Sequence, residues 1–405
     1  MKNVYIPSLE ICEKLADEYG TPFFITDAQT LRDRVASFKN AFGQRCKIYF
    51  AIKANFNPHT INVLKSAGID GIDAVSPFEI ELAKTLSFRS NQIIFTGNGS
   101  SDEELKSVMK EEVLCNIGSI SELERFGRMF PKANVSIRLN PGVGDGENEN
   151  VITAGDASKF GIIERDFAIA KALINKFELQ LKGLHCHIGS GFYKTEVFAK
   201  AVFHILQTAS QFPSLDFIDL GGGFGVRYHE DQAQIDLISF GSSIMDMVNK
   251  FEEENGKPVE LRFEPGKYLV SESTCLVSKI TTRKSTRTQE FVCLDTGFHH
   301  LIRPALYGSN HQIVNLNRKD GDKIKATVVG NVCESTDVFG KNVEMVDPKE
   351  GDLVALVSAG AYGSSMSSLY NLRPYASEVM VDGSNVTLTR KRQSFVETFQ
   401  SLGFV

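Results

Sequence analysis

The 405-residue sequence lacks three features that would point to particular classes of protein. It has no run of eighteen apolar residues, which a membrane-spanning helix would need. It has no long basic run, and with a net charge of -6 it shows no sign of a nucleic acid or an anionic membrane as partner. Residues 1–7 lack the apolar core of a secretory signal peptide. We therefore expect a cytoplasmic protein.

The cysteines also lack a pattern. They number seven, an odd count, and none forms a C-x-x-C pair, which argues against a disulfide framework or a structural zinc site. His185 and His187 have no third ligand at zinc-like spacing, so we expect no metal and a packing role for His185. All cysteines except Cys333 are expected to be small buried apolar side chains, namely Cys12, Cys46, Cys115, Cys186, Cys275 and Cys293.

What the sequence does contain is a regular alternation of short apolar runs and amphipathic stretches. The runs are residues 48–53, 72–76, 93–97, 114–118, 135–139, 183–188, 217–220 and 260–264. Helix-like stretches lie between them, at 59–67, 77–87, 101–111, 119–129, 164–177, 194–211 and 233–255. This repeat predicts an α/β fold with a (β/α)₈ TIM-like barrel, whose active site lies at the carboxyl ends of the strands.

The pattern changes after residue 267 to short β-type runs separated by turns. These are residues 276–282, 291–295, 324–329, 353–358, 378–381 and 386–390, followed by a helix at 394–401. The chain opens with a helix at 8–19, a strand at 22–26 and a helix at 27–42. We expect a barrel domain at 27–267 and a second, mostly β domain formed by 1–26 and 268–405. Residues 141–158 read as a long loop, a kind of segment that is usually functional or disordered.

Three features at the predicted strand ends carry chemistry. Lys53 ends the first strand and is either a solvated charge or a reactive amine. Gly221-Gly222-Gly223 and Glu264-Pro265-Gly266 follow the seventh and eighth strands, where barrels of this kind commonly bind phosphate through backbone N–H groups. A lysine able to form an imine, a phosphate anchor and a nearby glutamate are the parts that a pyridoxal phosphate enzyme needs.

Six motifs, taken in order, resemble the fold type III decarboxylases of basic amino acids, and among them the members that act on diaminopimelate. The resemblance runs from about residue 20 to the C-terminus. The motifs are Phe50-Ala51-Ile52-Lys53-Ala54-Asn55, His187-Ile188-Gly189-Ser190-Gly191, Gly221-Gly222-Gly223, Glu264-Pro265-Gly266, Cys333-Glu334-Ser335 and Gly360-Ala361-Tyr362-Gly363.

The resemblance implies that the cofactor is pyridoxal 5'-phosphate. Lys53 would bind it covalently, Glu264 would keep its pyridine nitrogen protonated, and His187 would stack on the ring. His187 is otherwise a satisfied core histidine. Asp73 and Arg138 would order the lysine and the ring, or else form a structural ion pair. Phosphate contacts would come from Ser190, Gly222, Gly223, Gly266, Lys267 and Tyr362.

The resemblance also implies a homodimer, because the Cys333-Glu334 pair would reach into the active site of the partner subunit. Cys333 is a candidate acid for protonating the carbanion, and Glu334 would contact the distal ammonium of the substrate. Arg303 suits a distal carboxylate, since its planar fork matches that group, although a surface salt bridge is the alternative. Lys267 stands where the family usually has arginine, which would contact phosphate or substrate. Tyr307 and Tyr362 complete the expected substrate contacts.

These features predict an enzyme that converts meso-2,6-diaminopimelate to L-lysine and CO₂. One alternative is a related decarboxylase that acts on ornithine, lysine or an amino acid of a specialised pathway. A different class of protein, a non-catalytic pyridoxal-binding regulatory module, is a further alternative.

Overall fold

The computed structural model describes residues 4–43, 45–193, 195–212, 214–228 and 235–404. It contains two compact units, which we describe separately. The sheet unit comprises residues 4–33, Arg227, Tyr228 and residues 269–404, and the barrel unit comprises Arg34–Val226 and residues 235–268. The domain boundaries expected from the sequence, at residues 27 and 267, stay predictions.

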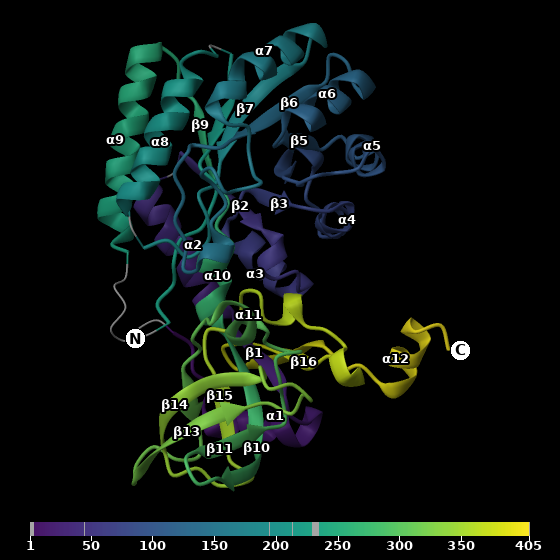
Figure 1. The fold of residues 1–405 in the computed structure, drawn as a ribbon, viewed down its shortest axis with the longest axis vertical. Coiled ribbons are helices and arrows are strands. Elements are labelled where there is room, and N and C mark those ends of the chain that lie inside the picture. Colours follow the sequence, from purple (N-terminus) through teal and green to yellow (C-terminus); the bar gives the residue numbers. More distant parts are fainter. Residues whose placement is uncertain (1–3, 44, 194, 213, 229–234, 405) are drawn as a thin grey trace. The chain divides into compact units, whose positions relative to one another are not determined.

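The barrel unit is a closed ring of eight parallel strands, and this confirms the (β/α)₈ prediction (Figure 1). The ring closes where β2 pairs with β9. The strands are β2 (Cys46–Ala51), β3 (Gly71–Ala74), β4 (Ile93–Phe95), β5 (Leu114–Ile117), β6 (Asn134–Leu139), β7 (Gln180–Cys186), β8 (Phe217–Asp219) and β9 (Glu260–Phe263).

Helices follow the barrel strands and lie outside them (Figure 1). They are α3 (Pro58–Ala67), α4 (Pro77–Thr85), α5 (Asp102–Lys110), α6 (Ile120–Met129), α7 (Phe167–Lys176), α8 (Thr195–Ala209) and α9 (Leu237–Asn255), and α2 (Ala28–Phe42) precedes the first strand. Local sequence explains where several begin. Ser76, Ser101 and Ser119 each accept a hydrogen bond from a backbone N–H in the first turn of the following helix. Asn57 does the same before Pro58, the residue type favoured at a first helical position.

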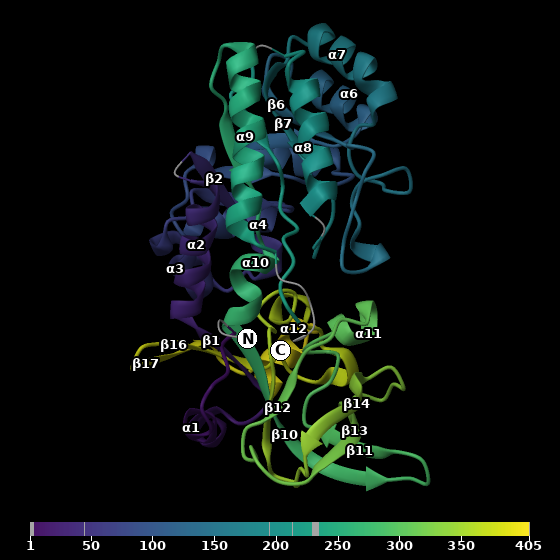
Figure 2. The same cartoon turned by 90° about the vertical axis from the view of Figure 1, so that its left-hand side faces the viewer.

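The sheet unit contains a nine-stranded sheet, which confirms the mostly β second domain (Figure 2). Its main path runs β14-β13-β11-β10-β1-β16-β17, and β15 pairs with both β10 and β12. The strands are β1 (Phe23–Asp27), β10 (Thr274–Ser285), β11 (Glu290–Leu294), β12 (Ile313–Asn315), β13 (Lys323–Val329), β14 (Val338–Val346), β15 (Leu353–Leu356), β16 (Ser377–Asp382) and β17 (Asn385–Arg390). Its helices are α1 (Leu9–Tyr19), α10 (Lys267–Val270, which begins in the barrel unit), α11 (Arg303–Tyr307) and α12 (Phe395–Ser401).

Both faces of this sheet are packed, because successive strand residues point to opposite sides. Phe24 and Leu276 belong to one apolar cluster, whereas Phe23, Ile25 and Val277 belong to another. The second cluster also contains Cys12 and Leu15 of α1, so the N-terminal helix covers that face.

The cysteines are all free thiols, and five of the six expected to be buried are buried. Cys293 is only half-buried, so the prediction for it is wrong, and Cys333 is exposed. Across the described residues, no helix combines the length and apolar character needed to cross a membrane.

Candidate active site

Lys53 forms an ion pair with Asp73 at the end of the first barrel strand. The lysine lies in a short 3₁₀ turn, Ile52–Ala54, just past β2 rather than on the strand as predicted. Its Nζ is 2.6 Å from Oδ2 of Asp73, which comes from the neighbouring strand β3. The Lys53 side chain is 36% exposed, whereas that of Asp73 has no exposure. A solvent-accessible amine is therefore held by a fixed, buried carboxylate.

Glu264 directly follows β9 and is buried at 4% exposure. Its Oε2 lies 3.1 Å from Nε2 of His185, whereas its Oε1 is buried with no hydrogen-bond partner among the described residues. Burial alone would raise the pKa of Glu264, but the charge and hydrogen bond of His185 lower it to about 2. Glu264 is thus an ionised carboxylate, and its Oε1 can accept a hydrogen bond from a bound group. His185 does not merely pack, and that prediction is wrong.

His187 is held by the glycine-rich loop after β8. The backbone N–H of Gly222 donates to Nδ1 of His187 at 2.9 Å, so in a neutral ring the proton is on Nε2. Burial and the nearby charge of Arg138 lower the pKa of His187 well below its ordinary value. The ring is therefore neutral in a fixed tautomer, and it lies nearly parallel to that of His185 at 6.5 Å. Its stacking on a cofactor stays a prediction.

Arg138, on β6, is buried and lies over the ring of Phe160, 4.6 Å from its centre. Burial lowers its pKa to about 10, against the raising effect of Glu264 and Asp73, so it stays charged at neutral pH. Within the described part of the chain, Asp73 contacts Lys53 through Oδ2 and its Oδ1 has no hydrogen-bond partner, so no ion pair joins it to Arg138. The alternative of a structural Asp73–Arg138 pair is therefore wrong.

Glycines allow the loops after β6, β7 and β8 to pack against one another. A Cβ on Gly223 would lie 2.0 Å from the carbonyl oxygen of Gly189, and a Cβ on Gly189 would lie 2.0 Å from that of Asp145. Both glycines also have positive φ, +95° and +148°. Ser190 lies in the loop after β7, and Gly266 lies between β9 and α10. Close backbone packing is one reason for these glycines, and phosphate binding stays a prediction.

Lys267 makes an ion pair that the sequence did not predict. Its Nζ is 2.6 Å from Oε1 of Glu147, and the two side chains are 3% and 12% exposed. Glu147 lies within the expected loop 141–158, where its backbone N–H donates to the carbonyl of Ser190 at 3.0 Å. The signal that could have found it is the position of Lys267, because a buried ammonium needs a counter-charge.

The remaining predicted residues belong to the sheet unit. Arg303 begins α11 and is 1% exposed, and it donates to the hydroxyl of Tyr228 at 2.5 Å and to that of Ser309 at 3.1 Å. The alternative of a surface salt bridge is therefore wrong. Tyr307 and Tyr362 are half-buried, and Tyr362 has a φ of +56°.

Cys333 and Glu334 are exposed on the sheet unit. Glu334 accepts a hydrogen bond from the hydroxyl of Tyr370 at 2.6 Å, and the backbone N–H of Cys333 donates to Asn371 at 2.9 Å. Both side chains are thus accessible, as a contact to a second subunit requires.

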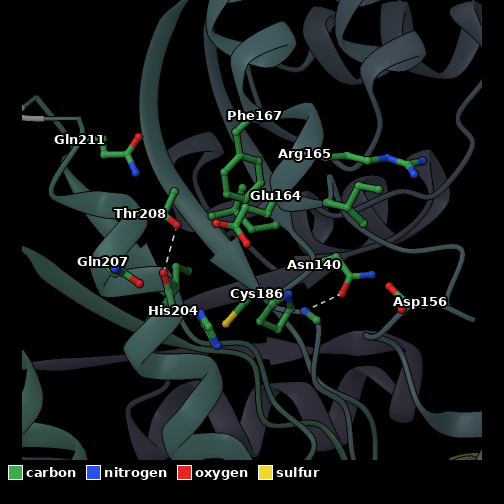
Figure 3. Close-up of a pocket in the computed structure, with 15 residues that line it drawn as sticks. Asn140, Asp156, Glu164, Arg165, Phe167, Cys186, His204, Gln207, Thr208 and Gln211 are labelled. Atoms are coloured by element: carbon green, nitrogen blue, oxygen red, sulfur yellow. Dashed lines mark hydrogen bonds between the residues drawn. The ribbon is translucent and has the colours of Figure 1, made fainter.

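A separate cavity of about 370 Å³ lies beside β6 and β7 (Figure 3). Cys186 lines it, whereas the preceding residue, His185, contacts Glu264, so the cavity is on the other side of β7. Most of its polar side chains, among them Glu164, Arg165 and His204, are exposed, whereas Asn140 is buried. None of the predicted site residues lines this cavity.

The barrel residues fit pyridoxal phosphate. The buried, unpartnered Oε1 of Glu264 suits the N–H of a protonated pyridine ring, and Lys53 offers an accessible amine. One group in the described chain has the spacing of a metal site, namely His185, Asp219 and Glu264, whose potential ligand atoms lie within 4.8 Å of one another. The expectation of no metal stays a prediction.

Comparison with known proteins agrees with this chemistry. The family model described as pyridoxal-dependent decarboxylase, pyridoxal binding domain, matches residues 28–271. Diaminopimelate decarboxylase of Methanothermobacter thermautotrophicus is 37% identical, over 94% of this chain and 91% of that protein. The Escherichia coli enzyme of the same name is 34% identical, over 95% and 94%.

Solved structures give the same result. A crystal structure of diaminopimelate decarboxylase has a TM-score of 0.90 at 32% identity and covers 97% of this chain and 96% of that chain. The Helicobacter pylori enzyme complexed with L-lysine has a TM-score of 0.89 at 29% identity, over 97% and 99%. This chain therefore belongs to the diaminopimelate decarboxylase family of pyridoxal-dependent decarboxylases.

Proposed function

We propose that this amino-acid decarboxylase converts meso-2,6-diaminopimelate to L-lysine and CO₂, and that it works as a homodimer. The observation that carries the proposal is similarity over the whole chain, both units included, to enzymes named for this substrate. A relative has been crystallised with L-lysine, which supports lysine as the product here.

In the proposed reaction the bond between Cα and its carboxylate carbon breaks. CO₂ leaves, the electron pair stays on Cα, and a proton is then added there. When bound, pyridoxal phosphate supplies an electron-accepting ring that is conjugated to the substrate nitrogen and stabilises this electron pair. The amine of Lys53 would hold the cofactor between turnovers, and Oε1 of Glu264 would accept the ring N–H. His187, which is neutral, would pack on the ring without adding charge.

The distal end of the substrate carries both an ammonium and a carboxylate. Arg303 and Lys267 offer cations for the carboxylate, and Glu334 offers an anion for the ammonium. In the proposed homodimer, Cys333 and Glu334 of each subunit reach the partner's active site, and the Cys333 thiol supplies the proton to Cα. Their exposure supports this role. The cytoplasmic location expected from the sequence stays a prediction.

The test is CO₂ release by purified protein loaded with pyridoxal phosphate, supplied with meso-diaminopimelate, L-lysine or L-ornithine in parallel. We expect turnover of diaminopimelate alone. Lys53→Ala should abolish it, whereas the matched control Lys47→Ala, on β2 and paired with Asp70 at 3.0 Å, should keep it. Turnover of ornithine or lysine alone would overturn the substrate proposal. Stable cofactor binding without any turnover would favour the regulatory module.

A further inference from the structure

Two buried side chains next to Glu264 have no role in the mechanism above. His185 lies on β7 and Asp219 on β8, and the two residues are direct neighbours across the paired strands. Both have 0% exposure. Together with Glu264, after β9, they form a cluster from three successive barrel strands, with polar atoms within 4.8 Å of one another.

The hydrogen bonds of this cluster are incomplete. Nε2 of His185 is 3.1 Å from Oε2 of Glu264, and Oδ1 of Asp219 accepts the backbone N–H of Gly221 at 2.9 Å. Among the described residues, Nδ1 of His185, Oδ2 of Asp219 and Oε1 of Glu264 have no partner. A buried polar atom without a partner costs free energy, so an arrangement with three of them calls for a functional reason.

We infer that His185 and Asp219 are positioning residues for Glu264. The hydrogen bond from His185 fixes Oε2, so that Oε1 is the oxygen left to accept the pyridine N–H, and the Asp219 side chain fills the adjoining space. This inference rests on the proposed role of Glu264 toward the cofactor.

The charges in the cluster support this arrangement. Burial and the nearby Glu264 raise the pKa of Asp219 well above its ordinary value, which favours the uncharged form of Asp219 next to Glu264. Without His185, burial would raise the pKa of Glu264, and a neutral Glu264 would hold a protonated pyridine less well. Arg138 and Lys53 also bear on these groups, and they are unchanged in the variants below.

The test is titration of the apoprotein with pyridoxal phosphate, followed by its visible absorbance, which reports the affinity and the protonation of the ring without any substrate. His185→Leu removes the donor, and we expect cofactor affinity about tenfold weaker, with a changed absorbance spectrum. His185→Gln keeps a donor and should stay within about threefold of the wild type. If His185→Leu does not fold, His185→Asn, which is too short to reach Oε2, takes its place.

Asp219 is tested by a matched pair. Asp219→Asn keeps the shape of the side chain and carries no charge, so it should bind the cofactor like the wild type, whereas Asp219→Ala should bind it more weakly. Equal losses in both Asp219 variants, or in His185→Leu and His185→Gln, would overturn the inference.

Glu264→Gln separates this inference from the proposed function. Weakened cofactor binding in Glu264→Gln with normal binding in His185→Leu would overturn the positioning role alone. Normal binding in Glu264→Gln would overturn the proposed role of Glu264 toward the ring and, with it, this inference, whereas the proposed reaction is tested separately by CO₂ release. Zinc retained by the wild type but lost from His185→Leu, with cofactor affinity that depends on it, would also overturn the inference by making the cluster an ion site.

Discussion

The ammonium of Lys53 lies 2.6 Å from the carboxylate of Asp73, a side chain with no exposure to solvent. Burial and the nearby Glu264 raise the pKa of Asp73, although Lys53 opposes this. The ionised form of Asp73 is therefore less favourable in the folded protein than in the unfolded chain, and at neutral pH it lowers stability.

Asp73→Asn should leave the apoprotein at least as stable as the wild type. It should, however, slow the reaction of Lys53 with the cofactor, because Lys53 loses the carboxylate that positions it. We expect the melting temperature to be unchanged or higher, and covalent attachment of pyridoxal phosphate to Lys53 to be about tenfold slower. Borohydride trapping followed by mass spectrometry measures the attachment. Asp70→Asn, which loses the ion pair with Lys47, is the control and should attach the cofactor normally. A large drop in the melting temperature of Asp73→Asn would contradict this prediction.

Removing one member of the Lys267–Glu147 pair should lower the free energy of unfolding far more than removing both charges. Lys267→Ala leaves the Glu147 carboxylate, which is 12% exposed, without this counter-charge. We expect this to lower the free energy of unfolding by about 3 kcal/mol. The double variant Lys267→Met/Glu147→Gln removes both charges and should recover most of that loss. Urea denaturation of the apoprotein measures both effects.

An exposed ion pair provides the control for that cycle. Lys250 and Glu254, four residues apart on α9, are 76% and 64% exposed, and Lys250→Ala should cost less than about 1 kcal/mol. If Lys267→Ala lowered the free energy of unfolding by no more than Lys250→Ala does, the buried pair would contribute no more to stability than an exposed pair.

The C-terminal helix α12 should contribute to the proposed homodimer. Phe395 and Phe404 are 75% and 64% exposed, and both rings contact that of Phe399, so an apolar patch faces solvent in the single chain. Phe395→Ser/Phe404→Ser should raise the dimer dissociation constant at least tenfold, as measured by sedimentation equilibrium. Phe78→Ser on α4, at 83% exposure, is the control. A double variant that stays as dimeric as the wild type would exclude this patch from the interface.

His300 should make the protein less stable as the pH falls below about 6.5. Burial lowers its pKa to about 4, partly offset by its hydrogen bond to the carbonyl of Pro374 at 3.0 Å. Between these two pH values the unfolded chain binds a proton that the folded protein does not. Stability should therefore fall by up to about 3 kcal/mol from pH 6.5 to pH 4.

Thermal denaturation across this pH range measures the effect. In His300→Gln the loss of stability on acidification should be smaller by about that amount, whereas in His204→Gln, which changes an exposed histidine of α8, it should match the wild type. Identical pH profiles for His300→Gln and the wild type would mean that other groups cause the loss.

Local sequence pattern predicted the barrel because each strand is short, apolar and followed by a helix. Ile48, Phe50 and Ile52 of the first apolar run, for example, are all fully buried. The pattern did not predict β14, since Gly340-Lys341-Asn342 interrupts its apolar residues and Asn342 adopts a φ of +54°.

The site was only partly predictable, because two of its main contacts join residues far apart in sequence. Lys53 and Glu264 were found from their motifs. The hydrogen bond between His185 and Glu264 spans 79 residues, and the ion pair between Lys267 and Glu147 spans 120. Only closure of the barrel brings such residues together, and nothing in the residues around Glu147 distinguishes it from a solvated loop carboxylate.

The packing of Asp145, Gly189 and Gly223 limits which amino-acid substitutions these loops can accept. The carbonyl oxygen of Asp145 fills the space where a side chain at position 189 would start, and that of Gly189 does the same for position 223. Three loops are thereby locked to one another. Libraries that vary one loop at a time should return only the original glycines, and new cofactor pockets will be reached by redesigning the three segments together.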